Sequence, residues 1–418
     1  MGLNTALKGD RLHIAIFGKR NAGKSSIINA LTGQSLAIVS DVKGTTTDPV
    51  SKAMELLPLG PCLFTDTPGL DDVGELGKKR IDKAVQVLNS TDIALVVVDM
   101  VLISDEDLQG ERGLSENEVR IISLIEEKKI PYIIVLNKSD CVNDAKAVSK
   151  IRETIVSKNN GIAVNVLSTV CGEGIEELKD AIISISPDSD SKLHIVGDLI
   201  EKNDIVVLVT PIDEAAPKGR LIMPQQQVIR DILDNNAIAI VTQVPELCDV
   251  LKRLSGSVKM VITDSQAFKE VAAIVPENIP LTSFSILFAR HKGELPKLIE
   301  GAKAVKKLKD GDKVLIAEGC THRRQCNDIG TVKIPHFLKN ITGKRIEIET
   351  CSGTGFPQDL SGYSLIIHCG GCTLNEKEMK HRIHRADLAG VPMVNYGIFL
   401  AYVNGILERS IKVFGLLY

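Results

Sequence analysis

The residues best suited to metal chemistry lie near the carboxyl end of the chain, in two short groups. A C-x-H pair and an H-C-x-x-C run together supply Cys320, His322, His368, Cys369 and Cys372. Each group directly follows an apolar run that is typical of a β-strand. Ligands of open parallel sheets gather beyond the carboxyl ends of the strands, so we expect the two groups to converge on one site.

Thiolates are soft ligands that suit zinc or an iron–sulfur cluster. Zinc would take Cys320, Cys369, Cys372 and one histidine in a closed tetrahedron. A 4Fe–4S cluster would take the same three thiolates and leave one iron open or weakly held. In a third interpretation each cysteine is a small buried hydrophobic residue. The Gly370-Gly371 pair would let the backbone curl around a metal centre. The residues alone leave zinc and the cluster open.

The amino-terminal part of the chain carries a phosphate-binding motif. Residues 18–25, GKRNAGKS, fit GxxxxGK[ST] between an apolar run and a helical segment, which is the context of a P-loop. Backbone N–H groups of such a loop face the phosphates, and the start of the helix adds a favourable dipole. Lys24 would reach the β- and γ-phosphates, and the Ser25 hydroxyl would bind Mg²⁺.

Two further motifs follow other predicted strands. Asp66 of the DTPG sequence can hold Mg²⁺ through water, while the Gly69 amide meets the γ-phosphate. In the NKSD sequence, Asp140 can accept hydrogen bonds from two N–H donors of guanine that adenine does not offer. The sequence therefore predicts GTP, rather than ATP, as the nucleotide.

These motifs resemble the translation-factor-related GTPases, especially the tRNA-modification and ribosome-assembly branch, over about residues 10–182. Asn21 and residues 40–45 are similar to the potassium-activated subgroup, which implies that they hold K⁺ and that Thr46 binds Mg²⁺. Leu70 stands where Ras-like proteins have a glutamine that orients water, so slow hydrolysis is expected.

With this resemblance, Lys24, Asp66 and Gly69 are the expected catalytic residues. The expected GTP contacts are Asn21, Ala22, Gly23, Lys24, Ser25, Ser26, Thr46, Asp66, Gly69, Asn137, Lys138, Asp140, Ser168 and Thr169.

Short β-branched runs alternate with helical patterns along the whole chain, which predicts an α/β protein with parallel sheets. The predicted strands fall into three sets, with a polar linker at 185–192 after the first. They are 12–18, 62–69, 93–99, 132–140 and 163–168; then 204–211, 237–243, 260–265 and 281–287; then 313–320, 345–351, 364–372 and 391–397. A helix is predicted over 224–236. No strict internal repeat is evident.

The composition favours a soluble globular protein. The net charge of −3 gives no basic footprint for nucleic acid. The longest apolar run, 93–103, is too short to span a bilayer and contains Asp99. We therefore expect a cytoplasmic protein that binds neither nucleic acid nor membrane, with its nine cysteines reduced or bound to metal.

The C-x-H pair, the H-C-x-x-C run and the preceding P-loop domain resemble the HydF family, the FeFe-hydrogenase maturation GTPases. The middle segment 211–233 also resembles the dimerisation domain of that family. The resemblance covers the whole chain and implies three domains: a Ras-like GTPase domain at 1–184, an α/β dimerisation domain at 193–277 and an iron–sulfur domain at 278–418.

The resemblance implies a GTP-hydrolysing scaffold or carrier whose cofactors are GTP, Mg²⁺, K⁺ and a 4Fe–4S cluster on Cys320, Cys369 and Cys372. It would receive a di-iron precursor with CO, cyanide and dithiolate ligands from two radical-SAM maturases. It would then deliver this precursor to apo FeFe-hydrogenase. The chain itself is expected to form a homodimer or a tetramer.

The sequence leaves several residue roles open. His322 and His368 are candidates for the fourth cluster ligand or for hydrogen-bond donors that support the ligands. Cys351 is interpreted as a buried bystander or as part of the cofactor pocket. The basic run at 380–385 is interpreted as an attractor of anions or as a solvated helix face. Two other functions remain: a ribosome- or tRNA-maturation GTPase with structural zinc, and an iron–sulfur redox sensor in which GTP is a switch ligand.

Overall fold

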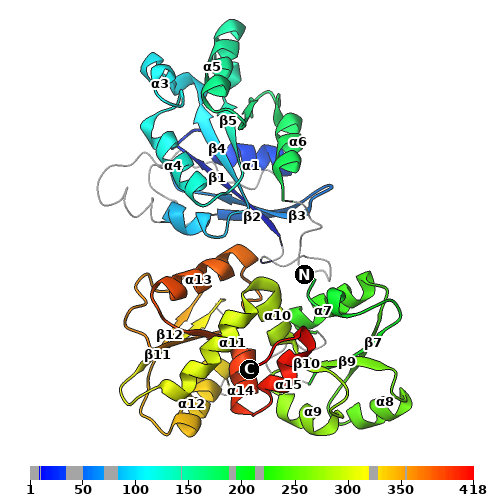
Figure 1. The fold of residues 1–418 in the computed structure, drawn as a ribbon. Coiled ribbons are helices and arrows are strands. Elements are labelled where there is room, and N and C mark those ends of the chain that lie inside the picture. Colours follow the sequence, from blue (N-terminus) through cyan, green and yellow to red (C-terminus); the bar gives the residue numbers. More distant parts are fainter. Residues whose placement is uncertain are drawn as a thin grey trace. The chain divides into compact units, whose positions relative to one another are not determined.

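The computed structural model describes residues 9, 11–33, 50–69, 83–142, 144–187, 194–211, 221–319, 328–353 and 355–418. The chain divides into two compact units, Met1–Lys192 and Leu193–Tyr418. Figure 1 shows both units, each an α/β arrangement with helices around sheets that are parallel except for β2. In the described part of the chain, no helix combines the length and apolar character needed to cross a membrane.

The first unit is built on a six-stranded sheet in the order β2-β3-β1-β4-β5-β6. Its strands are β1 (Leu12–Gly18), β2 (Val50–Leu56), β3 (Gly60–Asp66), β4 (Ile93–Asp99), β5 (Tyr132–Asn137) and β6 (Ala163–Val166). The central strands are almost wholly apolar because helices cover both faces of the sheet. The helices are α1 (Lys24–Thr32), α3 (Asp105–Gln109), α4 (Glu116–Glu127), α5 (Ala145–Lys158) and α6 (Ile175–Ile185).

The two faces of this sheet have separate cores. Helices α1 and α6 pack on the face that carries Ile14, Ile16 and Leu95. Helices α4 and α5 pack on the opposite face, which carries Phe17 and Val96. This arrangement leaves the carboxyl ends of β1, β3 and β5 at one edge of the sheet, where the predicted nucleotide motifs begin.

The second unit contains two four-stranded parallel sheets. The middle sheet has the order β10-β9-β7-β8, and its strands are β7 (Ile205–Val209), β8 (Ile238–Thr242), β9 (Val258–Thr263) and β10 (Leu281–Ser283). Its helices are α7 (Met223–Asp234), α8 (Leu247–Arg253), α9 (Phe268–Ile274), α10 (Phe284–Lys292) and α11 (Leu295–Lys303). Helix α7 begins close to the predicted position and has Pro224 in its first turn.

The last sheet has the order β12-β11-β13-β14. Its strands are β11 (Lys313–Glu318), β12 (Glu347–Ser352), β13 (Leu365–His368) and β14 (Met393–Asn395). Its helices are α12 (Ile334–Thr342), α13 (Glu376–Leu388), α14 (Tyr396–Val403) and α15 (Leu407–Ile411). The expected domain boundary at 277/278 stays a prediction; β10 lies beyond it but pairs with β9 of the middle sheet.

The strand predicted at 281–287 is wrong in its second half. Strand β10 ends at Ser283, and the following apolar residues form helix α10. The Ser283 side chain accepts a hydrogen bond from Ile286 N, which caps the new helix. A short apolar run does not distinguish a strand from a buried helix, and this run contains both.

The second unit contains a structural repeat, although no strict repeat is evident in its sequence. The two sheets of the second unit have the same topology, with a first strand flanked by the second strand on one side and by the third and fourth on the other. The sequences IPLTSFSILFA (279–289) and VPMVNYGIFLA (391–401) align at the end of each copy. The backbone agrees, because Val261 N donates to Pro280 O at 2.9 Å and Ile366 N donates to Pro392 O at 2.9 Å.

The two copies pack with equivalent residues in contact. Ser285 of α10 and Gly397 of α14 occupy matching positions, and a Cβ added to Gly397 would collide with Ser285 Cβ. Each copy also covers the other, because α11 packs against β14 and α15 packs against β10. This reciprocal packing explains why residues 193–418 form one compact unit rather than two.

Candidate functional sites

The P-loop follows β1 and leads into α1, as its motif predicts. Gly23 has φ +93, and a Cβ at this position would collide with Asn137 Nδ2. Glycine is therefore required by both conformation and space. Asn137 Nδ2 donates to Ala22 O at 2.8 Å, so the guanine motif and the phosphate loop are joined directly. Asn21 is exposed, and Ser26 is half-buried on the first turn of α1.

The Lys24 ammonium lies inside the loop. Its Nζ donates to Gly18 O at 3.1 Å and to Lys19 O at 2.7 Å, and the side chain is buried. The loop carbonyls thus hold a positive charge at the place where a phosphate chain would lie.

Asp66 and Ser25 form a second polar pair at this edge of the sheet. The Ser25 hydroxyl donates to Asp66 Oδ2, whereas Asp66 Oδ1 is buried without a hydrogen-bond partner among the described residues. Burial raises the pKa of the Asp66 carboxyl above its ordinary value. A hydroxyl beside an orphaned carboxylate oxygen is a donor set that fits Mg²⁺, directly or through water. Gly69 follows on this loop, while Thr46 and residues 40–45 lie outside the described residues.

The base-recognition motifs converge beyond β5 and β6. Ser168 Oγ donates to Asp140 Oδ1 at 2.6 Å, and this bond lowers the pKa of the exposed Asp140 carboxyl. Ser168 Oγ also accepts from the backbone N–H groups of residues 170 and 171, which orders the loop that contains Thr169. Lys138 pairs with Asp99 at 2.5 Å. The structure therefore holds an ionised carboxylate at the surface, ready to accept two hydrogen bonds from a base.

The two cysteine-bearing loops lie beyond neighbouring strands. Strands β11 and β13 are parallel neighbours, with Ala317 opposite His368. The Cys369 N–H donates to Ala317 O at 2.8 Å, which extends the pairing to the first cysteine. The chain turns from β11 to β12 on one side and from β13 to β14 on the other, so this edge is a topological switch point. Cys320, His322 and Cys326 lie outside the described residues, which resume at 328.

The Cys369 sulfur is held by backbone donors from both loops. It accepts from Gly319 N at 3.0 Å and from Gly371 N at 3.4 Å. The Thr373 hydroxyl donates to Gly319 O at 3.1 Å and ties the loops together again. N–H donors favour the thiolate over the thiol, and the thiolate is the form that binds metal. Gly319, the residue before Cys320, therefore lies against the Cys369 loop, and the predicted convergence of Cys320 itself stays a prediction.

No group of three metal-binding side chains occurs within the described residues, which leave out 320–327 and therefore one of the three predicted ligands. Cys369 and Cys372 are both half-buried, and their thiolates fit either zinc or an iron–sulfur cluster.

Of the two glycines between these cysteines, only Gly371 adopts a backbone conformation that disfavours other residues. Gly371 has φ +60, and a Cβ there would lie 3.1 Å from Met379 Sδ. A Cβ on Gly370 would meet only the Ser285 hydroxyl, at 3.8 Å. We expect Gly371→Ala to lower the free energy of unfolding by about 1–2 kcal/mol, because an alanine resists the left-handed conformation. Gly370→Ala is the matched control and should change it by less than about 0.5 kcal/mol. Urea unfolding of both metal-free variants checks this, and equal losses would contradict it.

His368 is wholly buried and both of its ring nitrogens are engaged. Arg382 NH1 lies 3.1 Å from Nε2, and an arginine only donates, so Nε2 accepts and Nδ1 carries the proton. Nδ1 lies 2.7 Å from Cys369 O, to which it donates. Burial, with the Arg382 charge, lowers the pKa of His368 to about 3. This geometry fits a residue that orients the cysteine loop, and it leaves neither ring nitrogen directed at a metal.

Arg382 is a residue that sequence reasoning missed. It lies in the basic run at 380–385, yet its side chain is buried and also donates to Glu378 at 2.9 Å and to Gly353 O at 2.7 Å. It therefore joins α13, the loop after β12 and His368. The sequence offers one signal for this role: Arg382 stands four residues after Glu378, a spacing that favours an ion pair on one face of a helix. Cys351, on β12, is half-buried, and burial raises the pKa of its thiol, as expected of a bystander.

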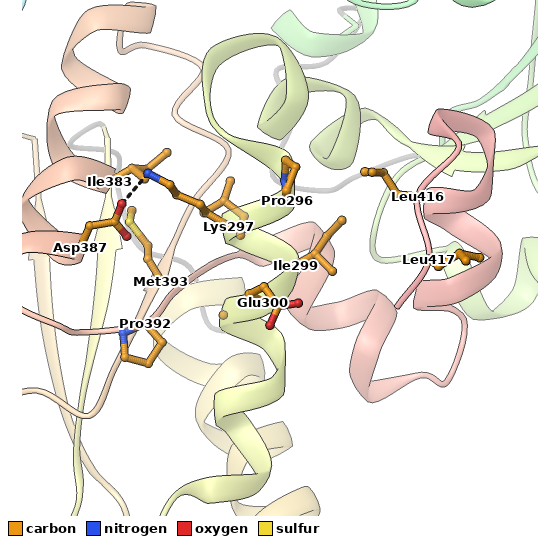
Figure 2. A pocket seen from close by; sticks show the side chains of 12 residues that line it. Pro296, Lys297, Ile299, Glu300, Ile383, Asp387, Pro392, Met393, Leu416 and Leu417 are labelled. Atoms are coloured by element: carbon orange, nitrogen blue, oxygen red, sulfur yellow. Dashed lines mark hydrogen bonds and ion pairs between the residues drawn. The ribbon is translucent and has the colours of Figure 1, made fainter.

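A separate groove of about 390 Å³ lies between α11, α13 and the last residues of the chain. Figure 2 shows the apolar side chains of Ile299, Met393, Leu416 and Leu417 around it, with the Lys297–Asp387 ion pair of 2.5 Å at its rim. Pro392 and Met393 stand at the amino end of β14, whereas the cysteines lie beyond the carboxyl end of β13. The groove is therefore distinct from the cysteine site.

Comparison with family models divides the chain into three segments. Residues 13–138 match the 50S ribosome-binding GTPase model. Residues 195–293 match the hydrogen maturase F dimerization domain, and residues 296–413 match the hydrogen maturase F tetramerization domain. The last two models together span more than half of the chain, and the chain carries a GTPase domain ahead of them.

Curated relatives match the amino-terminal part. GTPase Der of Kosmotoga olearia is 31% identical over 193 residues, which cover 44% of this chain and 41% of that protein. The tRNA modification GTPase MnmE of Acetivibrio thermocellus is 29% identical over 223 residues, which cover 52% and 45%. The chain thus spans less than half the length of these relatives. A crystal structure of Era from Aquifex aeolicus bound to GDP.AlF4- matches 59% of this chain and 98% of that chain, with a TM-score of 0.37 and 21% identity.

Proposed function

The chain belongs to the hydrogen maturase F family of hydrogenase-maturation GTPases, and from this premise we propose that it is a GTP-hydrolysing carrier for hydrogenase cofactor assembly. It would bind a 4Fe–4S cluster on Cys320, Cys369 and Cys372. It would accept a di-iron precursor with CO, cyanide and dithiolate ligands from two radical-SAM maturases and deliver it to apo FeFe-hydrogenase. We propose that the protein acts in the cytoplasm.

One observation carries the proposal more than any other: the Cys369 sulfur accepts a hydrogen bond from Gly319 N, the residue before Cys320. Two loops that are far apart in the sequence therefore meet at one edge of the sheet, at the residue that precedes Cys320. A bound cluster would supply one iron without a cysteine ligand, to which a ligand of the precursor can bind. The chain's own part is to hold the Cys369 thiolate with backbone N–H groups and to orient its loop through His368 and Arg382.

Metal analysis of anaerobically purified protein tests this assignment. We expect iron and acid-labile sulfide in equal amounts, with a brown colour. Stoichiometric zinc without colour would reject the cluster and favour a structural zinc domain instead.

In the nucleotide site, we assign Mg²⁺ to Ser25, Asp66 and Thr46, and GTP selectivity to Asp140. We also propose that K⁺ binds at Asn21 and supports hydrolysis, because Leu70 offers no polar group to orient water. GTP hydrolysis should then be at least about tenfold faster in KCl than in NaCl at equal ionic strength, since a cation that stabilises developing charge is worth several kcal/mol. Equal rates in the two salts would contradict the K⁺ assignment.

We propose that dimers form through β8. This strand lies at one edge of the middle sheet, and Ile238 and Val241 are 46% and 45% exposed. The other edge, β10, is buried under α15. An exposed apolar edge strand is suited to pair with a second copy.

The double variant Ile238→Lys/Val241→Lys should therefore be monomeric at micromolar concentration by light scattering, because charges desolvated in the interface oppose association. Val156→Lys, at an exposed apolar position in the GTPase domain, is the control and should stay dimeric. A dimer of unchanged affinity in the double variant would place the interface elsewhere.

A further inference from the structure

The Cys369–Cys372 loop belongs to the cysteine domain, the copy of the repeat with β11–β14, but it borders helix α10 of the middle domain, the copy with β7–β10. Ser285 is the second residue of α10, and its hydroxyl is the atom nearest to a Cβ added on Gly370. Ser265 follows β9, and its hydroxyl would lie 3.1 Å from a Cβ on Gly397. The Ser285 hydroxyl thus lies beside Gly370 of the Cys369–Cys372 loop, and the Ser265 hydroxyl lies beside Gly397, near the start of α14.

The internal repeat explains how this space arises. Ser265 matches Gly370, and Ser285 matches Gly397, in the two copies. Across the contact between the copies, Ser285 lies next to Gly370 and Ser265 lies next to Gly397. The glycines of the cysteine domain have no side chains at these two contacts, and the serines of the middle domain supply hydroxyl groups that can donate hydrogen bonds.

Both hydroxyl protons are weakly engaged. The Ser285 hydroxyl donates to Asn395 Oδ1 at 3.5 Å, and this oxygen already accepts from Ile398 N at 3.0 Å. The Ser265 hydroxyl donates to Ser283 Oγ at 3.5 Å. Contacts of this length are at the limit of a hydrogen bond, so each proton can turn to a better acceptor at little cost. Both side chains are half-buried, as are Cys369, Gly370 and Cys372.

The same helix brings a positive charge to the loop. Lys292, at the end of α10, is 2% exposed, and its Nζ donates to Cys372 O at 3.2 Å and to Leu374 O at 2.9 Å. A buried ammonium beside this loop attracts an anion that binds at the loop. Helix α10 therefore contacts the Cys369–Cys372 loop through Ser285 near its start and through Lys292 at its end.

We propose that Ser265 and Ser285 complete the cargo site and donate hydrogen bonds to an anionic metal complex on the open iron of the cluster. The fitting ligand class is a complex that presents acceptor atoms, such as the nitrogen of a metal-bound cyanide. This inference rests on the proposed function, and it assigns part of the cargo site to the domain that also forms the dimer.

The experiment uses the full-length protein with a reconstituted 4Fe–4S cluster. Potassium cyanide is titrated onto the reduced cluster and followed by electron paramagnetic resonance. A synthetic di-iron complex with CO, cyanide and dithiolate ligands is then bound, and its C≡N stretch is recorded in the infrared. The variants are Ser265→Ala, Ser285→Ala and their double; Ser361→Ala, an exposed serine of the cysteine domain, is the control.

We expect all variants to keep the iron content of the wild type. The double variant should bind cyanide about tenfold more weakly and shift the C≡N band, because two hydrogen bonds to a charged acceptor are lost. Ser285→Thr, which restores a hydroxyl, should recover most of the affinity. Should the double variant lose its cluster, the same effects, smaller in size, are expected in Ser265→Ala.

Unchanged cyanide affinity and an unchanged C≡N band in variants with a full cluster would overturn this inference and leave the proposed function intact. A wild-type protein that assembles no cluster, or whose cluster binds no cyanide, would overturn both.

Discussion

The Cys369→Ser variant is expected to lose the iron–sulfur cluster. In the wild type, the Cys369 sulfur accepts hydrogen bonds from N–H groups of both loops. The substitution therefore removes a metal ligand and also the hydrogen bond that joins the two loops. Loss of a supporting group alone weakens metal binding by about 10- to 100-fold, and loss of a thiolate should cost at least as much. We therefore expect the iron content after anaerobic reconstitution to fall at least about tenfold, together with the brown colour.

Cys351→Ser is the matched control. This thiol is half-buried on β12, two strands away from β13, and belongs to neither cysteine loop. Its variant should keep the full iron content. If Cys369→Ser kept iron, sulfide and colour while Cys351→Ser lost them, the ligand set assigned to the family motif would be wrong.

The Lys24→Ala variant is expected to lose GTP binding. The ammonium is buried in the P-loop, where water cannot replace it as a partner for phosphate. Truncating one partner of a buried charge pair costs 2–5 kcal/mol or more, so GTP affinity should fall on the order of a hundredfold and hydrolysis should cease to be measurable. Equilibrium binding of a fluorescent GTP analogue measures this, with the surface variant Lys179→Ala as the control.

The same variant separates the roles of the two sites. The cysteine site lies in a different compact unit, so Lys24→Ala should assemble a normal cluster. We expect it to fail in a complementation assay for hydrogenase activation, because GTP is proposed to act through conformation or partner affinity. Full activation by Lys24→Ala would show that GTP is dispensable.

Much of the scaffold follows from local sequence. Central strands such as β4 and β5 are buried on both faces, so their runs are uninterrupted and unambiguous. The sequence pattern does not predict β2, because this strand is an antiparallel edge strand with mostly exposed, mixed residues. The pattern predicts β10 four residues too long, through 287, because the first residues of helix α10 are apolar as well.

The site was predictable where chemistry demands residue types, as in the P-loop and the cysteine motifs. It was not predictable where tertiary packing decides. Arg382 reads as a surface cation, and only the fold turns it inward onto His368. Ser265 and Ser285 carry no motif; they matter because the two copies of the repeat place them beside Gly370 and Gly397. The repeat itself is visible in sequence only over its last strand and helix.

The central claim is that this protein carries a di-iron precursor to hydrogenase. Its most direct test mixes purified apo FeFe-hydrogenase with this protein, isolated from cells that also express the two radical-SAM maturases. We predict that hydrogen evolution appears, and that the same protein isolated without the maturases gives none. A protein that holds its full cluster, hydrolyses GTP and still yields no hydrogenase activity after co-expression would contradict the claim.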